Sequence, residues 1–214
     1  RREGKPVEDA RIDILWSDDN VAANNRVLEV VDNGPGMGGE SIRNAVKAGY
    51  TSNDPLGSLG LFGMGFNIAT ARLGETTVLL STRVEDNEWT GVEIDFDTLV
   101  KKHAFSAPVV RQTKTGTERS GTKVRVSRLK EGAYRHLRDK GRDLKRTLED
   151  VYAPILREGV VSIFINGMVL KPRPYCVWGE ARGVVRNKER VPAQIRIDRD
   201  LGSVLFDVEK NQYL

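Results

Sequence analysis

An acidic side chain at the end of an apolar run is followed directly by a series of glycines. In the segment VVDNGPGMGG, residues 30–39, Asp32 follows two valines and precedes Gly34 and Gly36. Glycine has no Cβ and tolerates positive φ, so the backbone here can approach a flat or anionic ligand closely. The Asp32 carboxylate could then accept a hydrogen bond from an exocyclic amine such as that of adenine. The alternative is a β-turn in which Asp32 and Asn33 bond their own backbone.

A second glycine-rich segment, GSLGLFGMGFN at residues 57–67, leads into a helical pattern. Gly60, Gly63 and Gly65 leave backbone amides accessible where a helix N-terminus carries a partial positive charge. Accessible amides at a helix N-terminus favour phosphate binding. The spacing matches neither the phosphate loop that ends in Lys-Ser/Thr nor the dinucleotide fingerprint, which excludes those two classes of nucleotide site.

Three motifs occur in a specific order: DNGPGM at residues 32–37, GLFGMGFN at 60–67 and SGT at 120–122. In order and spacing they resemble the GHKL ATPase superfamily, which includes gyrase B-type topoisomerases, heat-shock chaperones, histidine kinases and MutL mismatch-repair proteins. The resemblance extends from Ala10 to about Pro172 and is nearest the chaperone and microrchidia (MORC) branches. It implies a Bergerat-type α/β sandwich, an α+β fold with a mixed, mostly antiparallel sheet and helices on one face.

The resemblance also implies how ATP would be bound. Asp32 would bind adenine, and Thr122 would reach the Asp32 site through its hydroxyl and a water molecule. Two glycines would shape the base pocket and a methionine would line it, whereas residues 63–66 would cap the triphosphate. Residues 38–61 would form a mobile lid. The complete expected nucleotide-binding set is Asp32, Gly34, Gly36, Met37, Gly60, Leu61, Phe62, Gly63, Met64, Gly65, Phe66 and Thr122.

ATP and Mg²⁺ are therefore the expected cofactors, and ATP hydrolysis is the activity implied for the full-length protein. In the superfamily, a helix before the first strand supplies a Glu that activates water and an Asn that holds Mg²⁺. The chain starts with RREGKPVEDARIDILW, so we expect that helix to precede Arg1 in a longer protein. The catalytic residues are accordingly left unknown, and no metal ligand is assigned within the chain.

Hydrolysis would drive lid closure and ATP-dependent homodimerisation, or a domain rearrangement, acting on a macromolecular client such as DNA or protein. A non-hydrolysing module that binds a nucleotide, a partner protein or DNA is the alternative. The intact acid and glycines of the two glycine-rich segments favour the enzyme.

The elements that position these residues follow from hydrophobic periodicity. Alternation predicts two paired strands at residues 10–16 and 26–32, and three further strands that form one antiparallel sheet. Helical spacing predicts helices at 39–50 and 64–74, and a helical region from about 133 to 156 that breaks at Gly141. The three further strands are expected at 76–83, 89–96 and 121–129, with Asp95 and Asp97 on an exposed strand face.

The sequence pattern from residue 160 to the end of the chain predicts further β structure. An Asn166-Gly167 turn between apolar runs predicts a hairpin at residues 160–172. Beyond it, two β-rich runs flank a turn at 200–202. We therefore expect an ATP-binding domain at residues 1–174 and the start of a second, transducer-like or linker β unit at 175–214.

Composition limits the location and the chemistry. The hydrophobic content of 39% and the charged content of 30% are ordinary for a globular protein, and no apolar run approaches a membrane span. We expect a cytoplasmic protein without membrane contact. The lone Cys176 excludes an internal disulfide, and His103 and His136 lack the spacing of a metal site. Acids interspersed in the basic run at 130–146 favour a solvated helix face over a nucleic-acid patch.

Overall fold

The computed structural model describes residues 9–50, 63–103, 106–116, 119–173, 183–187, 189–192, 206–207 and 212–213. The chain divides into two compact units, residues 1–173 and 174–214. In the second unit, β9 (Gly183–Arg186) pairs antiparallel with β10 (Glu189–Pro192), and β11 (Phe206–Asp207) pairs with β12 (Gln212–Tyr213). The turn expected at 200–202 lies outside the described residues.

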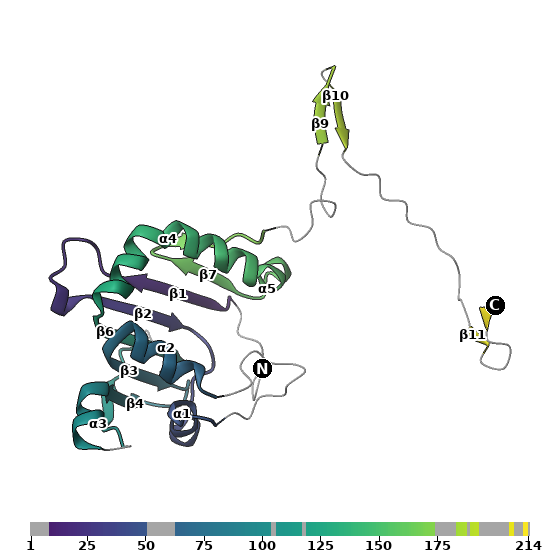
Figure 1. The fold of residues 1–214 in the computed structure, drawn as a ribbon. Helices are drawn as coiled ribbons and strands as arrows, with labels where there is room; N and C mark the ends of the chain where they lie inside the picture. The colour runs from purple at the N-terminus through teal and green to yellow at the C-terminus, as the bar shows by residue number, and fades with distance from the viewer. Residues whose placement is uncertain are drawn as a thin grey trace. The chain divides into compact units, whose positions relative to one another are not determined.

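The first unit is built on an eight-stranded sheet with the order β5-β4-β3-β6-β2-β1-β7-β8 (Figure 1). All neighbouring strands are antiparallel except β1 and β7, which run parallel. The expected mixed, mostly antiparallel sheet is therefore confirmed. Its strands are β1 (Arg11–Trp16), β2 (Val27–Asp32), β3 (Gly74–Thr82), β4 (Glu88–Asp95), β5 (Val109–Thr113), β6 (Gly121–Leu129), β7 (Ser162–Ile165) and β8 (Met168–Val169).

Five helices of the described part of the chain pack on one face of this sheet, as the resemblance implies. The shorter α1, α2 and α3 cover β3 and β4, whereas α4 and α5 lie against β1 and β7 (Figure 1). A short 3-10 turn, η1 (Ala23–Asn25), lies in the loop between β1 and β2. The helices are α1 (Gly39–Val46), α2 (Gly65–Leu73), α3 (Phe96–Lys102), α4 (Glu131–Val151) and α5 (Ala153–Glu158).

Strand alternation separates an apolar face of the sheet from a charged one. On β2, Leu28 belongs to the core beneath α4, so Val30 and Asp32 face the helices as well. The intervening Glu29 faces the other side, where it pairs with Arg125 at 3.1 Å. Three core clusters between sheet and helices result, centred on Val126, Leu79 and Ile165.

Helix α4 is kinked where the sequence predicts a break. Lys140 has non-helical backbone angles, and Gly141 follows it. A Cβ at Gly141 would lie 3.1 Å from Cζ2 of Trp16, so the glycine lets the helix approach that indole closely. Along α4, Arg135 pairs with Glu131 and Arg138 with Asp139, which agrees with a solvated basic face. None of the helices in the described part of the chain is long and apolar enough to cross a membrane.

The expected strand at residues 89–96 is wrong at its end. Strand β4 stops at Asp95, and α3 begins at Phe96, whose side chain packs against the core. Asp95 caps the helix by accepting a 2.8 Å hydrogen bond from the Thr98 backbone N–H, and it pairs with Arg128 at 2.7 Å. Asp95 is therefore the N-cap of α3 and not, as the sequence predicted, part of an exposed strand face.

Two further predictions need correction. Helix α1 ends at Val46, short of the predicted end at residue 50, and strand β5 was not predicted.

Asp95 should make stability depend on acid pH. The Thr98 backbone N–H and the Arg128 guanidinium lower the pKa of Asp95 to about 2. A lowered pKa stabilises the fold above about pH 4, and this contribution disappears as the pH falls from about 4 to about 2. Asp95→Ala should lower the free energy of unfolding by about 1 kcal/mol at pH 7 because the cap is lost. Asp95→Asn keeps a capping oxygen, so it should cost less and should weaken the acid dependence.

Urea denaturation of both variants and the parent at pH 7 and between pH 5 and pH 2 measures these effects. Equal stability of Asp95→Ala and the parent at pH 7 would show that the cap contributes nothing.

Candidate nucleotide site

The candidate site is a row of three polar side chains across three adjacent strands. Asp32 at the end of β2 lies opposite Thr122 of β6, which lies opposite Ser81 of β3. Because side chains alternate along a strand, all three share the face that carries the apolar core. The register therefore places one carboxylate and two hydroxyls at one end of the sheet, under the helical layer.

The Asp32 carboxylate is half-buried and organises the turn after it. Its Oδ1 accepts a 2.8 Å hydrogen bond from the Gly34 backbone N–H. Burial raises the pKa of Asp32 above its usual range, and the backbone N–H groups of Gly34 and Thr122 oppose that rise. Part of the β-turn alternative thus holds, because Asp32 does bond its own loop. Asn33 does not: its Oδ1 accepts from the Arg11 N–H at 2.7 Å, which ties the loop to β1.

Ser81 is a buried member of the row that no sequence motif identifies. Its side chain is 1% exposed, and its Oγ accepts from the Met37 backbone N–H at 2.8 Å. The same Oγ donates to the Gly121 carbonyl at 2.9 Å and lies 3.1 Å from Thr122 Oγ1. A hydroxyl carries one proton, so Thr122 donates to Ser81. The lone pairs of Thr122 can then accept from a ligand or a water molecule, and only the strand register could have revealed Ser81.

The first glycine segment lies against the end of β3. Gly36 has a φ of +75°, and a Cβ there would lie 1.9 Å from the Thr82 carbonyl oxygen. A Cβ at Gly34 would lie 2.8 Å from Asp32 Oδ1. Both positions therefore exclude side chains, which keeps the backbone close to the carboxylate. Met37, held by Ser81, packs against the core cluster of Leu79.

The second glycine segment is described only from Gly63 onward, and Gly60, Leu61 and Phe62 lie outside the described residues. Gly63 has a φ of +61°, and its carbonyl accepts from the Gly49 N–H at 3.1 Å, which joins it to the turn after α1. Gly65 begins α2, and no heavy atom lies within 4 Å of a Cβ placed there. Met64 is 46% exposed. Phe66 packs against the same core cluster as Met37, so both glycine segments border one core.

The predicted lid begins with an ordered helix. Ile42 of α1 is buried in the core with Leu79 and Val92. Asn67 of α2 donates from Nδ2 to the Val46 carbonyl at 3.0 Å, which connects the two helices that flank the segment. Residues 51–62 lie outside the described residues, so lid motion stays a prediction.

Two described acids on neighbouring strand positions face away from the site. Asp13 of β1 and Glu29 of β2 occupy strand positions that alternate with Asp32, and each is paired with an arginine on the other face, at 2.6 Å and 3.1 Å respectively. His103 ends α3 in a left-handed conformation and His136 is exposed on α4. The described ranges contain no group of three His, Cys, Asp or Glu side chains that could hold a metal.

The close approach at Gly36 can be tested without a ligand. Gly36→Ala should lower the free energy of unfolding by about 1–3 kcal/mol, because alanine is strained at positive φ and its Cβ would collide with the Thr82 carbonyl. Gly39→Ala is the matched control, since Gly39 begins α1 with open space around it. The control should be neutral or slightly stabilising, because alanine favours helices. Urea denaturation decides this, and equal effects of the two variants would contradict the geometry.

Comparisons with known proteins show partial similarity to two longer chains. Protein MICRORCHIDIA 7 of Arabidopsis thaliana is 35% identical over 72 residues, which cover 33% of this chain and 10% of that protein. The crystal structure of the ATPase region of Saccharomyces cerevisiae topoisomerase II has 16% identity and a TM-score of 0.49, over 76% of this chain and 43% of that chain. The compared chains are thus longer than the parts that match.

A family model described as "Histidine kinase-, DNA gyrase B-, and HSP90-like ATPase" matches residues 8–124, more than half of the chain. The matched region contains both the expected acid and the two glycine segments. The GHKL superfamily expected from the three motifs is confirmed, with the plant relative supporting the MORC-like branch. The chain belongs to the histidine kinase-, DNA gyrase B- and HSP90-like ATPase family.

Proposed function

We propose that the chain binds ATP at the end of the sheet where Asp32, Thr122 and Ser81 form a row. The observation that carries this proposal is the half-buried Asp32 carboxylate, with Gly36 pressed against the β3 backbone beside it. A half-buried acceptor beside glycines suits adenine, whose amine can donate to the acceptor and whose flat ring can approach the bare backbone. Membership of an ATPase family supports the same ligand.

Each residue of the row has a distinct role in this proposal. The Asp32 carboxylate accepts a hydrogen bond from the adenine amine, and the Thr122 hydroxyl accepts from a ligand group or a bridging water. Ser81 positions Thr122 and the Met37 backbone through its three contacts. The backbone amides at the start of α2, including those of Gly63 and Gly65, bind the triphosphate with the helix dipole.

Mg²⁺ would supply charge neutralisation on the phosphates. Protein sites usually hold it with one or two carboxylates together with the nucleotide. The described residues offer no preformed cluster of metal ligands. Mg²⁺ would therefore be carried by the phosphates of the nucleotide.

In the full-length protein, we propose that Mg²⁺-dependent hydrolysis is coupled to closure of the lid at residues 38–61. Closure would drive homodimerisation or a domain rearrangement that acts on a DNA or protein client. The competing hypothesis is a module that binds nucleotide, a partner protein or DNA without hydrolysis. A thermal-shift assay with non-hydrolysable ATP analogues tests nucleotide binding directly, because a ligand specific for the folded state raises the melting temperature.

The adenine role of Asp32 gives a sharp test. Asp32→Asn should weaken ATP binding by at least about tenfold, because the amide lacks the charge and presents a donor toward the adenine amine. Asp13→Asn is the matched control, since Asp13 lies on the opposite face and pairs with Arg11. Isothermal titration with ATP measures both variants after circular dichroism has established that they fold. ATP affinity of Asp32→Asn within a few-fold of the parent would refute the adenine role.

Hydrolysis by the 214-residue chain should be close to background. General-base assistance is worth roughly 10²–10⁴ in rate, and the neighbouring acids Asp13 and Glu29 face away from Asp32 in ion pairs. Phosphate release with Mg²⁺ and ATP measures this, with Glu29→Gln as the comparison. Rapid release that the Glu29→Gln variant loses would mean that an acid within this chain activates water after all.

A further inference from the structure

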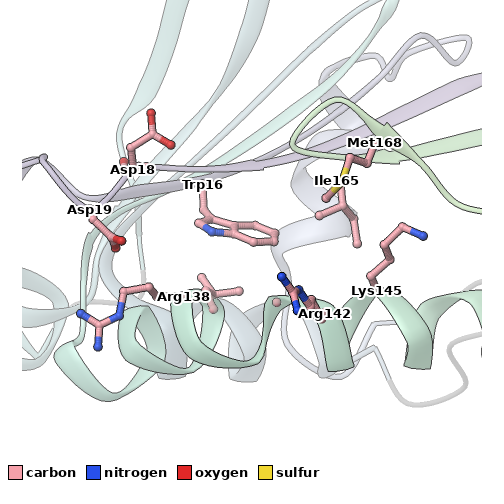
Figure 2. Close-up of a pocket in the computed structure, with 11 residues that line it drawn as sticks. Trp16, Asp18, Asp19, Arg138, Arg142, Lys145, Ile165 and Met168 are labelled. Carbon is pink, nitrogen blue, oxygen red and sulfur yellow. The ribbon is translucent and has the colours of Figure 1, made fainter.

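A pocket lies at the other end of the β1–β2 pair from Asp32. Its volume is about 290 Å³, and Trp16 forms its centre (Figure 2). Trp16 pairs with Leu28, whereas Ile12 pairs with Asp32, so four strand positions separate the pocket from the candidate nucleotide site. The proposed ATP binding does not use this pocket.

Hydrogen bonds fix two walls of the pocket, and a helix kink shapes the third. Tyr134 donates from its hydroxyl to the Asp18 carbonyl at 3.0 Å and is 3.1 Å from Asp19 Oδ1, which anchors the loop after β1. The side-chain Oδ1 of Asn166, in the β7–β8 turn, accepts a 3.1 Å hydrogen bond from the backbone N–H of Trp16. The third wall is α4, kinked at Lys140 beside Gly141. The concavity is therefore built into the fold.

The pocket has an apolar interior and, at its wall, the positively charged side chain of Arg142. Trp16, Leu137, Ile165 and Met168 line it, and the Met168 side chain is 56% exposed at the rim. Arg138 is engaged by Asp139 and Lys145 by Glu149. Within the described part of the chain, Arg142 has no such partner. Figure 2 shows the Arg142 guanidinium below the edge of the Trp16 ring, on the side toward Ile165.

The size of the pocket limits its occupant. Sites for drug-sized ligands usually measure about 300–1,000 Å³, so this pocket of about 290 Å³ is at the lower end of that range and has room for a single large side chain. Pockets of this kind receive the anchor residues of protein partners, which are often aromatic and surrounded by a rim that excludes water. The exposed Met168 extends the apolar surface outward, as such a rim requires.

The charges around the pocket indicate which residue should follow the large apolar side chain of a partner segment. Arg142 favours a carboxylate next to the anchor, because a charge-assisted hydrogen bond is stronger than a neutral one. Asp18 and Asp19 line the opposite end of the pocket and repel an acid there (Figure 2). We propose that this pocket docks a segment of a partner protein in which a large apolar side chain is directly followed by an Asp or Glu. The acid points toward Arg142.

A peptide panel tests this docking on the whole chain. The probes are fluorescently labelled peptides Ser-Gly-X-Z-Gly-Ser, with Phe, Trp, Leu or Ala at X and Asp, Glu, Asn or Lys at Z, and fluorescence polarisation measures their affinity. Peptides with a large apolar residue before Asp or Glu should bind about tenfold more tightly than their Asn, Lys or Ala counterparts. Arg142→Gln should remove the preference for the acid and leave ATP binding unchanged.

The matched control is Arg146→Gln, which changes an exposed arginine of the same helix outside the pocket. It should leave every peptide affinity within about twofold. The proposal is overturned if no apolar-acid peptide binds more tightly than its Asn and Ala counterparts, or if Arg146→Gln has the same effect as Arg142→Gln. It is also overturned if a labelled DNA oligonucleotide, and not the acidic peptides, binds in an Arg142-dependent way, because the pocket would then recognise phosphate.

Discussion

The candidate nucleotide site depends on the register of β2 against β6. Side chains alternate along β2, so burying Leu28 under the helices commits Val30 and Asp32 to the same face. A slip of one residue would move the carboxylate to the charged face and Glu29 into the core. The apolar contacts of Leu28, 8% exposed, thus fix the position of a polar group at the strand end. Packing energy, rather than any bond made by Asp32, places the acid.

The buried hydroxyl of Ser81 has partners within the protein, whereas that of Thr77 on the same strand has none among the described residues. An unsatisfied buried hydroxyl costs about 1–3 kcal/mol, and Ser81 avoids that cost through contacts with the Met37 N–H, the Gly121 carbonyl and Thr122. The contacts also connect the loop after β2 to two strands that lie far from it in sequence. The proposed base-binding side is therefore held by strands β2, β3 and β6, whereas the proposed phosphate side lies at the start of α2.

Local signals in the sequence were sufficient for part of the fold. The β1 and β2 strands, the Asn166-Gly167 turn and the interruption of α4 near Gly141 were all predicted, because alternation, turn chemistry and glycine act within a few residues. Strand β5 was missed because it is short and mostly exposed, which hides its alternation. The end of β4 was wrong because Asp95 fits both an exposed strand and a helix cap, and only Phe96 entering the core decides between them.

Only part of the candidate site is visible in a sequence motif. Asp32 and the glycines stand out along the chain, whereas Ser81 acquires its role from strand pairing across β6, which no local pattern encodes. The Trp16 pocket is similar, since residues from three distant segments form it. Ile12 and Trp16 are four residues apart on β1, or about 14 Å, with the packed Ile14 between them. Ile12 and Trp16 both pack against the cluster of Ile165, but Asp32 and Arg142 belong to none of the three core clusters. Substitutions of Asp32 and Arg142 should therefore act additively, because energetic coupling beyond about 10 Å requires shared contacts or an element with two discrete arrangements.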